Sequence, residues 1–217
     1  MSGSREALLD GVRAALGRRR GQARPACPPS LLAPRNLTVS ERVALFVQRF
    51  EKLNGKAICA GSRAEAKRAV EGLIQGRSAV ASNAPFLIDC GIQTIAGIRS
   101  GITDKDELRA ACATADFGVT GATYALADTG TFVMMSSPEE GRLISLLPPA
   151  HIGVISASSI LSGLDDLLTA VPKPSDATSA MVLITGPSRT ADIEQILVRG
   201  VHGPGEIYAV IVDEESQ

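Results

Sequence analysis

Aromatic residues are scarce in this sequence, which has no Trp, two Tyr and five Phe among 217 residues. Few side chains are therefore available to stack on nucleic-acid bases, and a net charge of −1 provides no basic surface for a phosphate backbone. We expect no nucleic-acid partner. Since 45% of the residues are apolar, the core must be built mainly from aliphatic side chains.

Clustered metal ligands are also missing. The four cysteines stand at positions 27, 59, 90 and 112 without a C-x-x-C pair, and the chain has only two histidines. Zinc and iron–sulfur sites normally need ligands close together in the sequence, so we expect this chain to hold no metal and no cofactor of its own.

Long apolar runs are absent as well. No window approaches the roughly 18 apolar residues that a membrane span needs. Residues 1–17 lack the apolar stretch of a signal peptide. We therefore expect a cytoplasmic protein with reduced thiols.

Three segments are predicted along the chain. Residues 1–17 form an amphipathic helix, 18–37 a proline-rich linker, and 38–217 an α/β domain. A helix this short is marginal in water, so it should pack on a partner subunit or on its own domain. The sequence leaves both options open.

The domain begins with an alternation of helices and strands. Capping boxes at Thr38-x-x-Glu41 and Ser62-x-x-Glu65 predict helices that end near residues 54 and 76. Short apolar strands follow them at 56–60 and 78–82. Helix and strand in turn, with short connections, are typical of a parallel sheet covered by helices.

Further along, the elements are predicted from shorter signals. Residues 86–90 fit a helical turn or a strand. We predict helices at 104–115, from 158 or 159 onward, and at 190–198, a helix or turn at 120–126, and a loop at 172–176. Strands are predicted near 113–119, 130–136, 151–156, 180–185 and 206–212, the last closing the sheet.

A central stretch rich in glycine and hydroxyl groups is the first candidate site. Its backbone N–H groups could hold a carboxylate or phosphate, and Asp128 could act as base or nucleophile. The competing interpretation is ordinary turn chemistry. The candidate ligand-binding residues here are Gly118, Thr120, Gly121, Thr129, Gly130 and Thr131.

Other candidates lie in loops. His151 is a candidate catalytic residue and His202 a candidate ligand-binding residue, because both lie beside loops rich in Pro or Gly, although each could serve as a structural histidine. The loop residues Ser188, Arg189 and Thr190 could bind a carboxylate or phosphate; simple helix capping is the alternative. Arg142 could reach a substrate carboxylate or pair with its acidic neighbours at 139 and 140.

Five motifs, in this order, resemble the lactate utilisation protein C family, whose shared unit is the LUD domain. They read G-V-T-G-A, A-D-T-G-T, R-L-I-S-L-L-P-P-A-H-I, G-P-S-R-T-A-D-I-E and G-V-H-G-P-G, and they span residues 116–213. The resemblance implies a fold like that of the sugar-phosphate isomerase and CoA-transferase group: a Rossmann-like parallel sheet flanked by helices, with an added β-rich part.

The same resemblance implies a role in oxidising L-lactate to pyruvate with iron–sulfur partner proteins, which would carry the clusters. The chain would then be a subunit of an L-lactate dehydrogenase complex that binds a small anionic ligand or a partner. Two alternatives stay open: a stand-alone isomerase- or CoA-transferase-like enzyme using a carboxylate, and a non-catalytic binding or scaffold module. Asp128 stands where glutamate is expected in many relatives, which puts its catalytic role in question.

Overall fold

The computed structural model describes residues 2–23, 36–191, 197–200 and 202–214. The chain divides into two compact units, Met1–Ala33 and Pro34–Gln217. The first contains α1 (Ser2–Ala15), where the helix of residues 1–17 was predicted. Most of the predicted proline-rich linker falls on residues 24–35, outside the described residues. No helix in the described ranges is long and apolar enough to cross a membrane.

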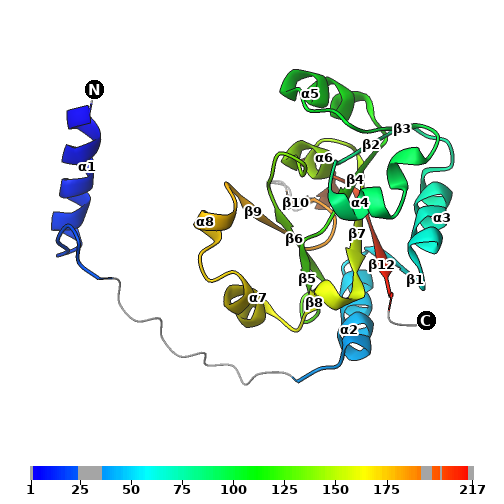
Figure 1. Ribbon diagram of the computed structural model, residues 1–217, viewed down its shortest axis with the longest axis horizontal. Coiled ribbons are helices and arrows are strands. Elements are labelled where there is room, and N and C mark those ends of the chain that lie inside the picture. Colours follow the sequence, from blue (N-terminus) through cyan, green and yellow to red (C-terminus); the bar gives the residue numbers. More distant parts are fainter. Residues whose placement is uncertain (1, 24–35, 192–196, 201, 215–217) are drawn as a thin grey trace. The chain divides into compact units, whose positions relative to one another are not determined.

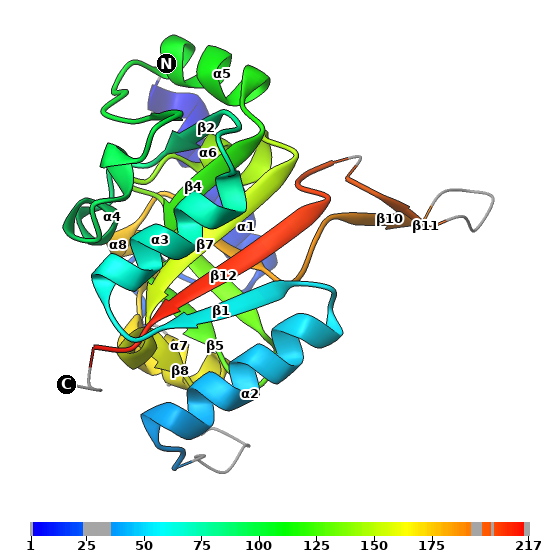
Figure 2. The ribbon, with the colours of Figure 1, turned by 90° about the vertical axis from the view of Figure 1, so that its right-hand side faces the viewer.

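The second unit is built on a six-stranded sheet in which all neighbouring strands are parallel. Figures 1 and 2 show its twisted strands between layers of helices. In spatial order the strands are β1 (Lys56–Ala60), β12 (Glu206–Val212), β7 (Ala150–Ser156), β4 (Phe117–Gly121), β2 (Ala79–Ala81) and β3 (Ile98–Arg99).

Both faces of this sheet are covered, which explains why its central strands are mainly apolar. One face packs against α3 (Arg63–Ile74) and α4 (Pro85–Asp89), with η1 (Ile92–Thr94) beside them. The opposite face is covered by α2 (Val39–Lys52), α5 (Lys105–Thr114) and α6 (Arg142–Leu146), together with a second sheet.

The second sheet has four strands, in the order β8 (Ile160–Leu161), β5 (Tyr124–Leu126), β6 (Thr131–Met135) and β9 (Met181–Ile184). Phe132 of β6 packs its ring 5.6 Å from that of Phe46 and 5.4 Å from that of Phe50, both on α2. This aromatic cluster joins the two sheets through α2. The predicted fold class, a parallel sheet flanked by helices with an added β-rich part, is confirmed.

Shorter elements complete the unit. They are η2 (Ala157–Ser159), α7 (Leu164–Ala170), α8 (Pro174–Ala177) and the antiparallel hairpin of β10 (Arg189–Ala191) and β11 (Leu197–Arg199). Figure 2 shows the hairpin extending away from the parallel sheet.

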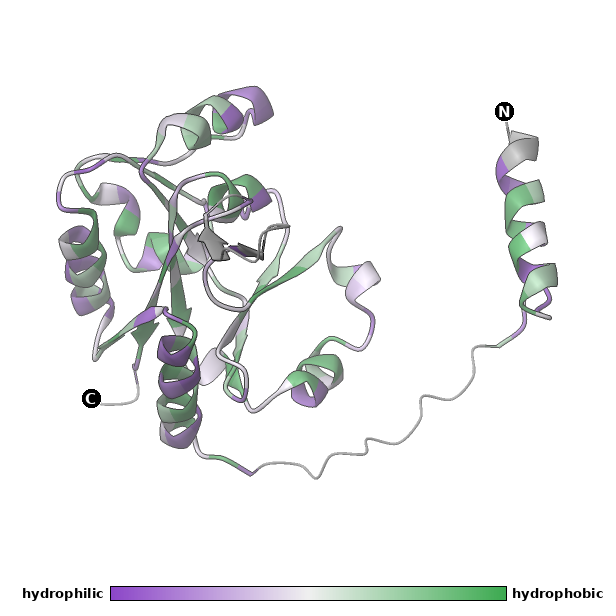
Figure 3. Ribbon diagram, turned by 180° about the vertical axis from the view of Figure 1, so that it is seen from behind, coloured by the Kyte–Doolittle hydropathy of each residue, from purple (hydrophilic) through white to green (hydrophobic). Residues whose placement is uncertain are grey.

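Three helix starts that capping signals predicted, at Thr38, Ser62 and Asp104, are confirmed. Thr38 Oγ1 accepts the backbone N–H of Glu41 at 3.3 Å, and the Glu41 carboxylate accepts the N–H of Thr38 at 2.8 Å. Asp104 caps α5 by accepting two backbone N–H groups. In Figure 3, α2 carries a hydrophobic stripe beside hydrophilic turns, as the spacing of its apolar residues requires.

Several predicted elements were wrong. Residues 120–126 are not a helix or turn but the end of β4 and all of β5. The predicted helix at 190–198 is contradicted by β10 and β11, although residues 192–196 lie outside the described part. The helix expected from 158 begins only at Leu164, because Ile160 and Leu161 pair with β5. The predicted loop at 172–176 contains the start of α8. Strand β12 lies inside the sheet rather than closing it.

Candidate functional site

A buried carboxyl group lies where two strands of the parallel sheet end. Glu140, in the loop between β6 and α6, is only 7% exposed. Its Oε2 accepts the hydroxyl of Ser82, directly after β2, at 2.9 Å, and the backbone N–H of Gly121, the last residue of β4, at 3.1 Å. A backbone hydrogen bond from Asn83 N to Glu139 O, 2.9 Å long, holds the loop against β2.

The position of Glu140 in the topology favours ligand binding. From β2 the chain continues to β3 on one side, whereas from β4 it continues to β7 on the other. The connections diverge between β2 and β4, and in open α/β sheets ligands bind at the carboxyl ends of strands at such a point. Ser82 and Gly121 stand on either side of that crevice.

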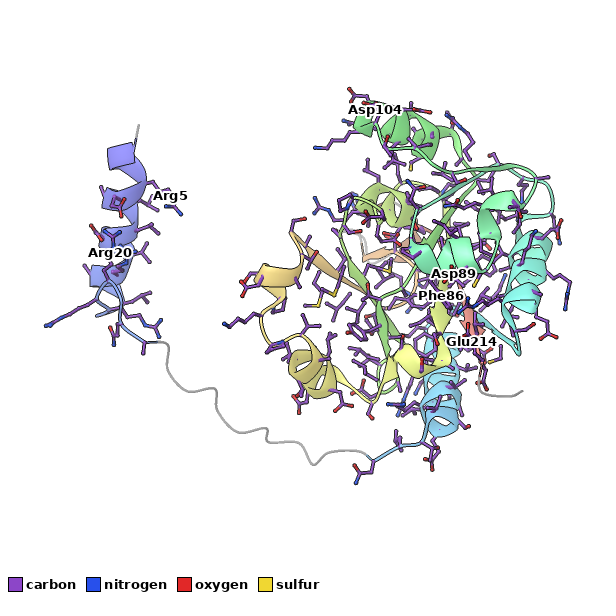
Figure 4. All side chains as sticks on the ribbon, in the orientation of Figure 1. Arg5, Arg20, Phe86, Asp89, Asp104 and Glu214 are labelled. Atoms are coloured by element: carbon purple, nitrogen blue, oxygen red, sulfur yellow. The ribbon has the colours of Figure 1, made fainter. Side chains whose placement is uncertain are left out.

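A cavity of about 320 Å³ opens there. Phe86 of α4, labelled in Figure 4, is among its lining residues. So are Gly121, Ser136 and Glu140. Two buried oxygens of these residues, Glu140 Oε1 and Ser136 Oγ, have no hydrogen-bond partner. An unsatisfied buried polar atom costs about 1–3 kcal/mol, so a ligand that supplies the missing partners would be favoured.

Burial also changes the acidity of Glu140. It raises the pKa of the carboxyl to about 8, against the opposing effect of the hydrogen bonds from Ser82 and Gly121. At neutral pH the group is therefore protonated and can donate a hydrogen bond. A neutral carboxyl beside a cavity suits general acid–base chemistry or the recognition of an anion.

A second cavity, of about 210 Å³, lies at the opposite, amino-terminal edge of the sheet. It brings together three residues that the sequence singled out separately: His151, His202 and Ser188. Hydrogen bonds from Ser188 N to Pro204 O (2.8 Å) and from Gly205 N to Pro149 O (2.9 Å) hold the three loops together.

His151 is completely buried at the start of β7, with its Nε2 2.7 Å from Thr120 Oγ1. Its Nδ1 has no hydrogen-bond partner. Burial lowers the pKa of the imidazole to about 4, so the ring is neutral at physiological pH.

The residues of the glycine- and hydroxyl-rich stretch lie in several different parts of the structure and do not form one site. Gly118, Thr120 and Gly121 belong to β4 rather than to a loop that opens a helix, and Gly118 packs against the carbonyl of Ile144 on α6. Gly130 has φ +64° and lies so close to α2 that a Cβ would be 2.5 Å from Phe50 N. Thr131 Oγ1 bonds the hydroxyls of Thr129 and Thr185, each at 2.8 Å.

Asp128 lies in the turn between β5 and β6, against Gly163, and is not among the residues that line either cavity. Its backbone N–H donates to Ser162 O at 3.2 Å, and its Oδ1 is buried without a partner. The structure brings His151 and His202 together in one cavity and places Asp128 outside it. A catalytic role for Asp128 stays a prediction.

Three further residues predicted to bind a ligand, Arg142, Arg189 and Thr190, do not line either cavity. Arg142 is exposed at the start of α6 and forms none of the ion pairs found in the described residues, so the pairing with Glu139 or Glu140 considered from the sequence is not seen. Arg189 donates to the carbonyl of Leu53 at 2.5 Å. Thr190 belongs to β10 and therefore begins no helix. The loop at 186–188 follows β9 of the four-stranded sheet, not a strand of the parallel one.

Glu140 was missed as a site residue in the sequence. The run P-E-E-G has the composition of a surface turn, and only the folded chain shows that one of the two glutamates is buried. The one available signal was position, because the run closely follows the strand predicted at 130–136.

The described cysteines Cys59, Cys90 and Cys112 are free thiols. Burial is the main cause that raises the pKa of each. Across the residues that the structure describes, no three side chains of His, Cys, Asp or Glu gather as a metal site would require.

Fold and site together define a Rossmann-like α/β protein with a crevice at the carboxyl ends of its strands. The family model of the LUD domain matches residues 43–212, and the chain belongs to this family.

Curated relatives match over a shorter region. Lactate utilization protein C 1 of Bacillus mycoides is 35% identical over 53% of this chain and 51% of its own length. Lactate utilization protein C of Bacillus subtilis is 38% identical over 46% of this chain and 43% of its own length. The chain thus spans about half the length of the curated relatives that it matches.

The fold is shared with a solved structure. The crystal structure of a DUF162 family protein from Deinococcus radiodurans superposes with a TM-score of 0.63 at 21% identity. The alignment covers 81% of this chain and 99% of that one. This likeness concerns the fold alone.

Proposed function

We propose that the protein acts in lactate utilisation, as a component that works with iron–sulfur partner proteins in oxidising L-lactate to pyruvate. We further propose that it binds a small carboxylate beside Glu140. Family membership and the names of the relatives support the first part. The observation that carries the second is the buried Glu140 carboxyl, which has one unpartnered oxygen at the crevice between β2 and β4.

The contacts of Glu140 suggest how a carboxylate would be held. Ser82 and Gly121 occupy Oε2, so the proton is left for Oε1, the oxygen without a partner. A ligand carboxylate could accept that proton's hydrogen bond, and the hydroxyl of Ser136 could supply a second one. Hydrogen bonds to a charged group in a site of low dielectric constant are stronger than neutral ones.

The proposal predicts that carboxylate binding depends on pH. Below the pKa of Glu140, about 8, the neutral carboxyl donates to the ligand; above it, an ionised Glu140 repels the ligand. The affinity for lactate and pyruvate, measured by titration calorimetry, should be constant below that pH. It should then fall by about tenfold for each further pH unit.

Two variants control this experiment. Glu140→Gln keeps an N–H donor and cannot ionise, so it should bind at every pH without the alkaline loss. Glu139→Gln removes an exposed charge that also lines the cavity, so it should raise the affinity at every pH and keep the alkaline loss. A wild-type affinity that stays flat across the alkaline range, or an unchanged affinity in Glu140→Ala, would remove Glu140 from the ligand site.

A second candidate function is a stand-alone enzyme that uses a carboxylate as acid, base or nucleophile. The sequence assigned that role to Asp128, whereas the cavity favours Glu140. Turnover by the purified chain, tested anaerobically without partners, decides between the two functions. Activity that is lost in Glu140→Gln but kept in Asp128→Asn would favour the stand-alone enzyme. Lactate oxidation that appears only when partner proteins are added would favour the subunit.

A further inference from the structure

The cavity at the amino ends of β7 and β12 differs in chemistry from the Glu140 crevice. Among the residues that the structure describes, its walls contain no Asp, Glu, Lys or Arg, and half of these lining residues are aliphatic or proline. These are Leu146, Val182, Leu183, Ile184, Pro187, Pro204 and Ile207. Because no fixed charge in the lining would neutralise an ion, such a cavity selects an uncharged molecule.

Two hydroxyl groups of this lining are already engaged within the protein. The Ser145 hydroxyl donates to the carbonyl of Arg142 at 3.1 Å, and the Thr185 hydroxyl bonds that of Thr131 at 2.8 Å. By contrast, Nδ1 of His151 is shielded from solvent and has no hydrogen-bond partner. His151 therefore carries the clearest unmet hydrogen-bonding need in the lining.

The bond between Thr120 and His151 indicates which ring nitrogen carries the proton. Its length of 2.7 Å fits either direction, so the proton is assigned from the other partners of the Thr120 hydroxyl. The other acceptor within reach of the Thr120 hydroxyl, Met134 Sδ, is 4.0 Å away and weak. If Thr120 donates to Nε2, the proton of the neutral imidazole is on Nδ1, which is then a buried donor without an acceptor.

We propose that this cavity is a second ligand site, which takes a compact, uncharged carbonyl compound. Its apolar body would lie against β9 and Ile207, with the carbonyl oxygen accepting the Nδ1–H of His151. An apolar cavity of about 150 Å³ holds one benzene ring, so a volume of 210 Å³ suits a ring bearing a small carbonyl group. The site lies at the opposite edge of the sheet from Glu140 and does not depend on the proposed function.

Histidine-selective ¹⁵N NMR of the full chain tests the proposal directly, because the sequence contains only two histidines. The variant His202→Gln assigns the two sets of signals. Without ligand, His151 should show the neutral tautomer protonated at Nδ1. Benzamide should then shift its Nδ1 signal in a saturable way, with a Kd of about 1 mM, which is ordinary for so small a molecule.

Two other probes and two variants make the test specific. Toluene lacks the carbonyl acceptor, so it should bind about tenfold more weakly than benzamide, which corresponds to the free energy of one lost hydrogen bond. Benzoate carries a charge that the lining does not neutralise, so it should also bind about tenfold more weakly than benzamide. In His151→Phe the preference for benzamide over toluene should vanish. In Thr120→Val the His151 ring loses the hydrogen bond to Nε2, so its ¹⁵N signals should show a mixture of the two neutral tautomers. A wild-type His151 protonated at Nε2, or one whose signals benzamide leaves unmoved, would overturn the proposal.

Discussion

Replacing Glu140 by glutamine is expected to make the protein progressively more stable than wild type as the pH rises from about 4.5 to about 8. In the unfolded chain the carboxyl ionises near its ordinary pKa of 4.5, whereas burial raises its pKa in the folded protein to about 8. Between pH 4.5 and pH 8 the carboxyl is ionised in the unfolded chain and protonated in the folded protein, so folding requires the uptake of a proton. Wild type therefore loses stability with rising pH, on the order of 5 kcal/mol in total, at about 1.4 kcal/mol per pKa unit.

Urea denaturation of both proteins over this pH range measures the effect. His151 is present in both, so its own contribution cancels from the difference. The His151 contribution to the free energy of unfolding changes with pH in the opposite direction. Because folding lowers the pKa of this histidine from 6.5 to about 4, the protein loses stability as the pH falls through that range. Glu139→Gln should follow wild type throughout. A stability difference between Glu140→Gln and wild type that does not vary with pH would contradict the assignment of a protonated Glu140.

Substituting Gly118 by alanine is expected to destabilise the protein by about 3 kcal/mol or more. A Cβ at this position in β4 would lie only 1.7 Å from the carbonyl oxygen of Ile144 and 2.8 Å from its carbonyl carbon. Both are backbone atoms of α6, so relief requires the helix to move away from the sheet rather than a side chain to rotate. The midpoint of urea denaturation should fall sharply.

Gly72, on the exposed side of α3, provides the matched control. A Cβ there meets nothing within 4 Å, and alanine is favoured over glycine in a helix by up to about 1 kcal/mol. Gly72→Ala should therefore be neutral or slightly stabilising. An equally mild effect in Gly118→Ala would show that α6 does not pack on β4 as closely as described.

The part of the fold that depends on local signals could be predicted from the sequence. Caps such as Thr38 and Asp104 mark helix starts because their side chains satisfy backbone N–H groups within the same few residues. Strands of the parallel sheet were recognisable because burial on both faces requires continuous apolar runs. His151 and His202 were found as loop-flanked polar residues, although only the fold shows that they share a cavity.

The remainder depends on partners distant in sequence. Thr190 has the chemistry of a helix cap, yet it pairs with Val198 in a hairpin, so tertiary context overrode its propensity. Glu140 and its neighbour Glu139 are the same residue type in one turn, but only Glu140 meets Ser82 and Gly121. No local pattern distinguishes two adjacent carboxylates when the difference arises from strands some 20 to 60 residues away.

The placement of β12 has a consequence for synthesis of the protein. This strand fills the gap between β1 and β7, and the ribosome adds it after every other strand of that sheet. Until it emerges, β1 has no neighbour in the sheet and β7 presents an unpaired edge, which is a template for pairing with other chains. Completion of the sheet must therefore wait until residue 212 has left the ribosome, and a nascent chain stalled before residue 206 would be prone to aggregate.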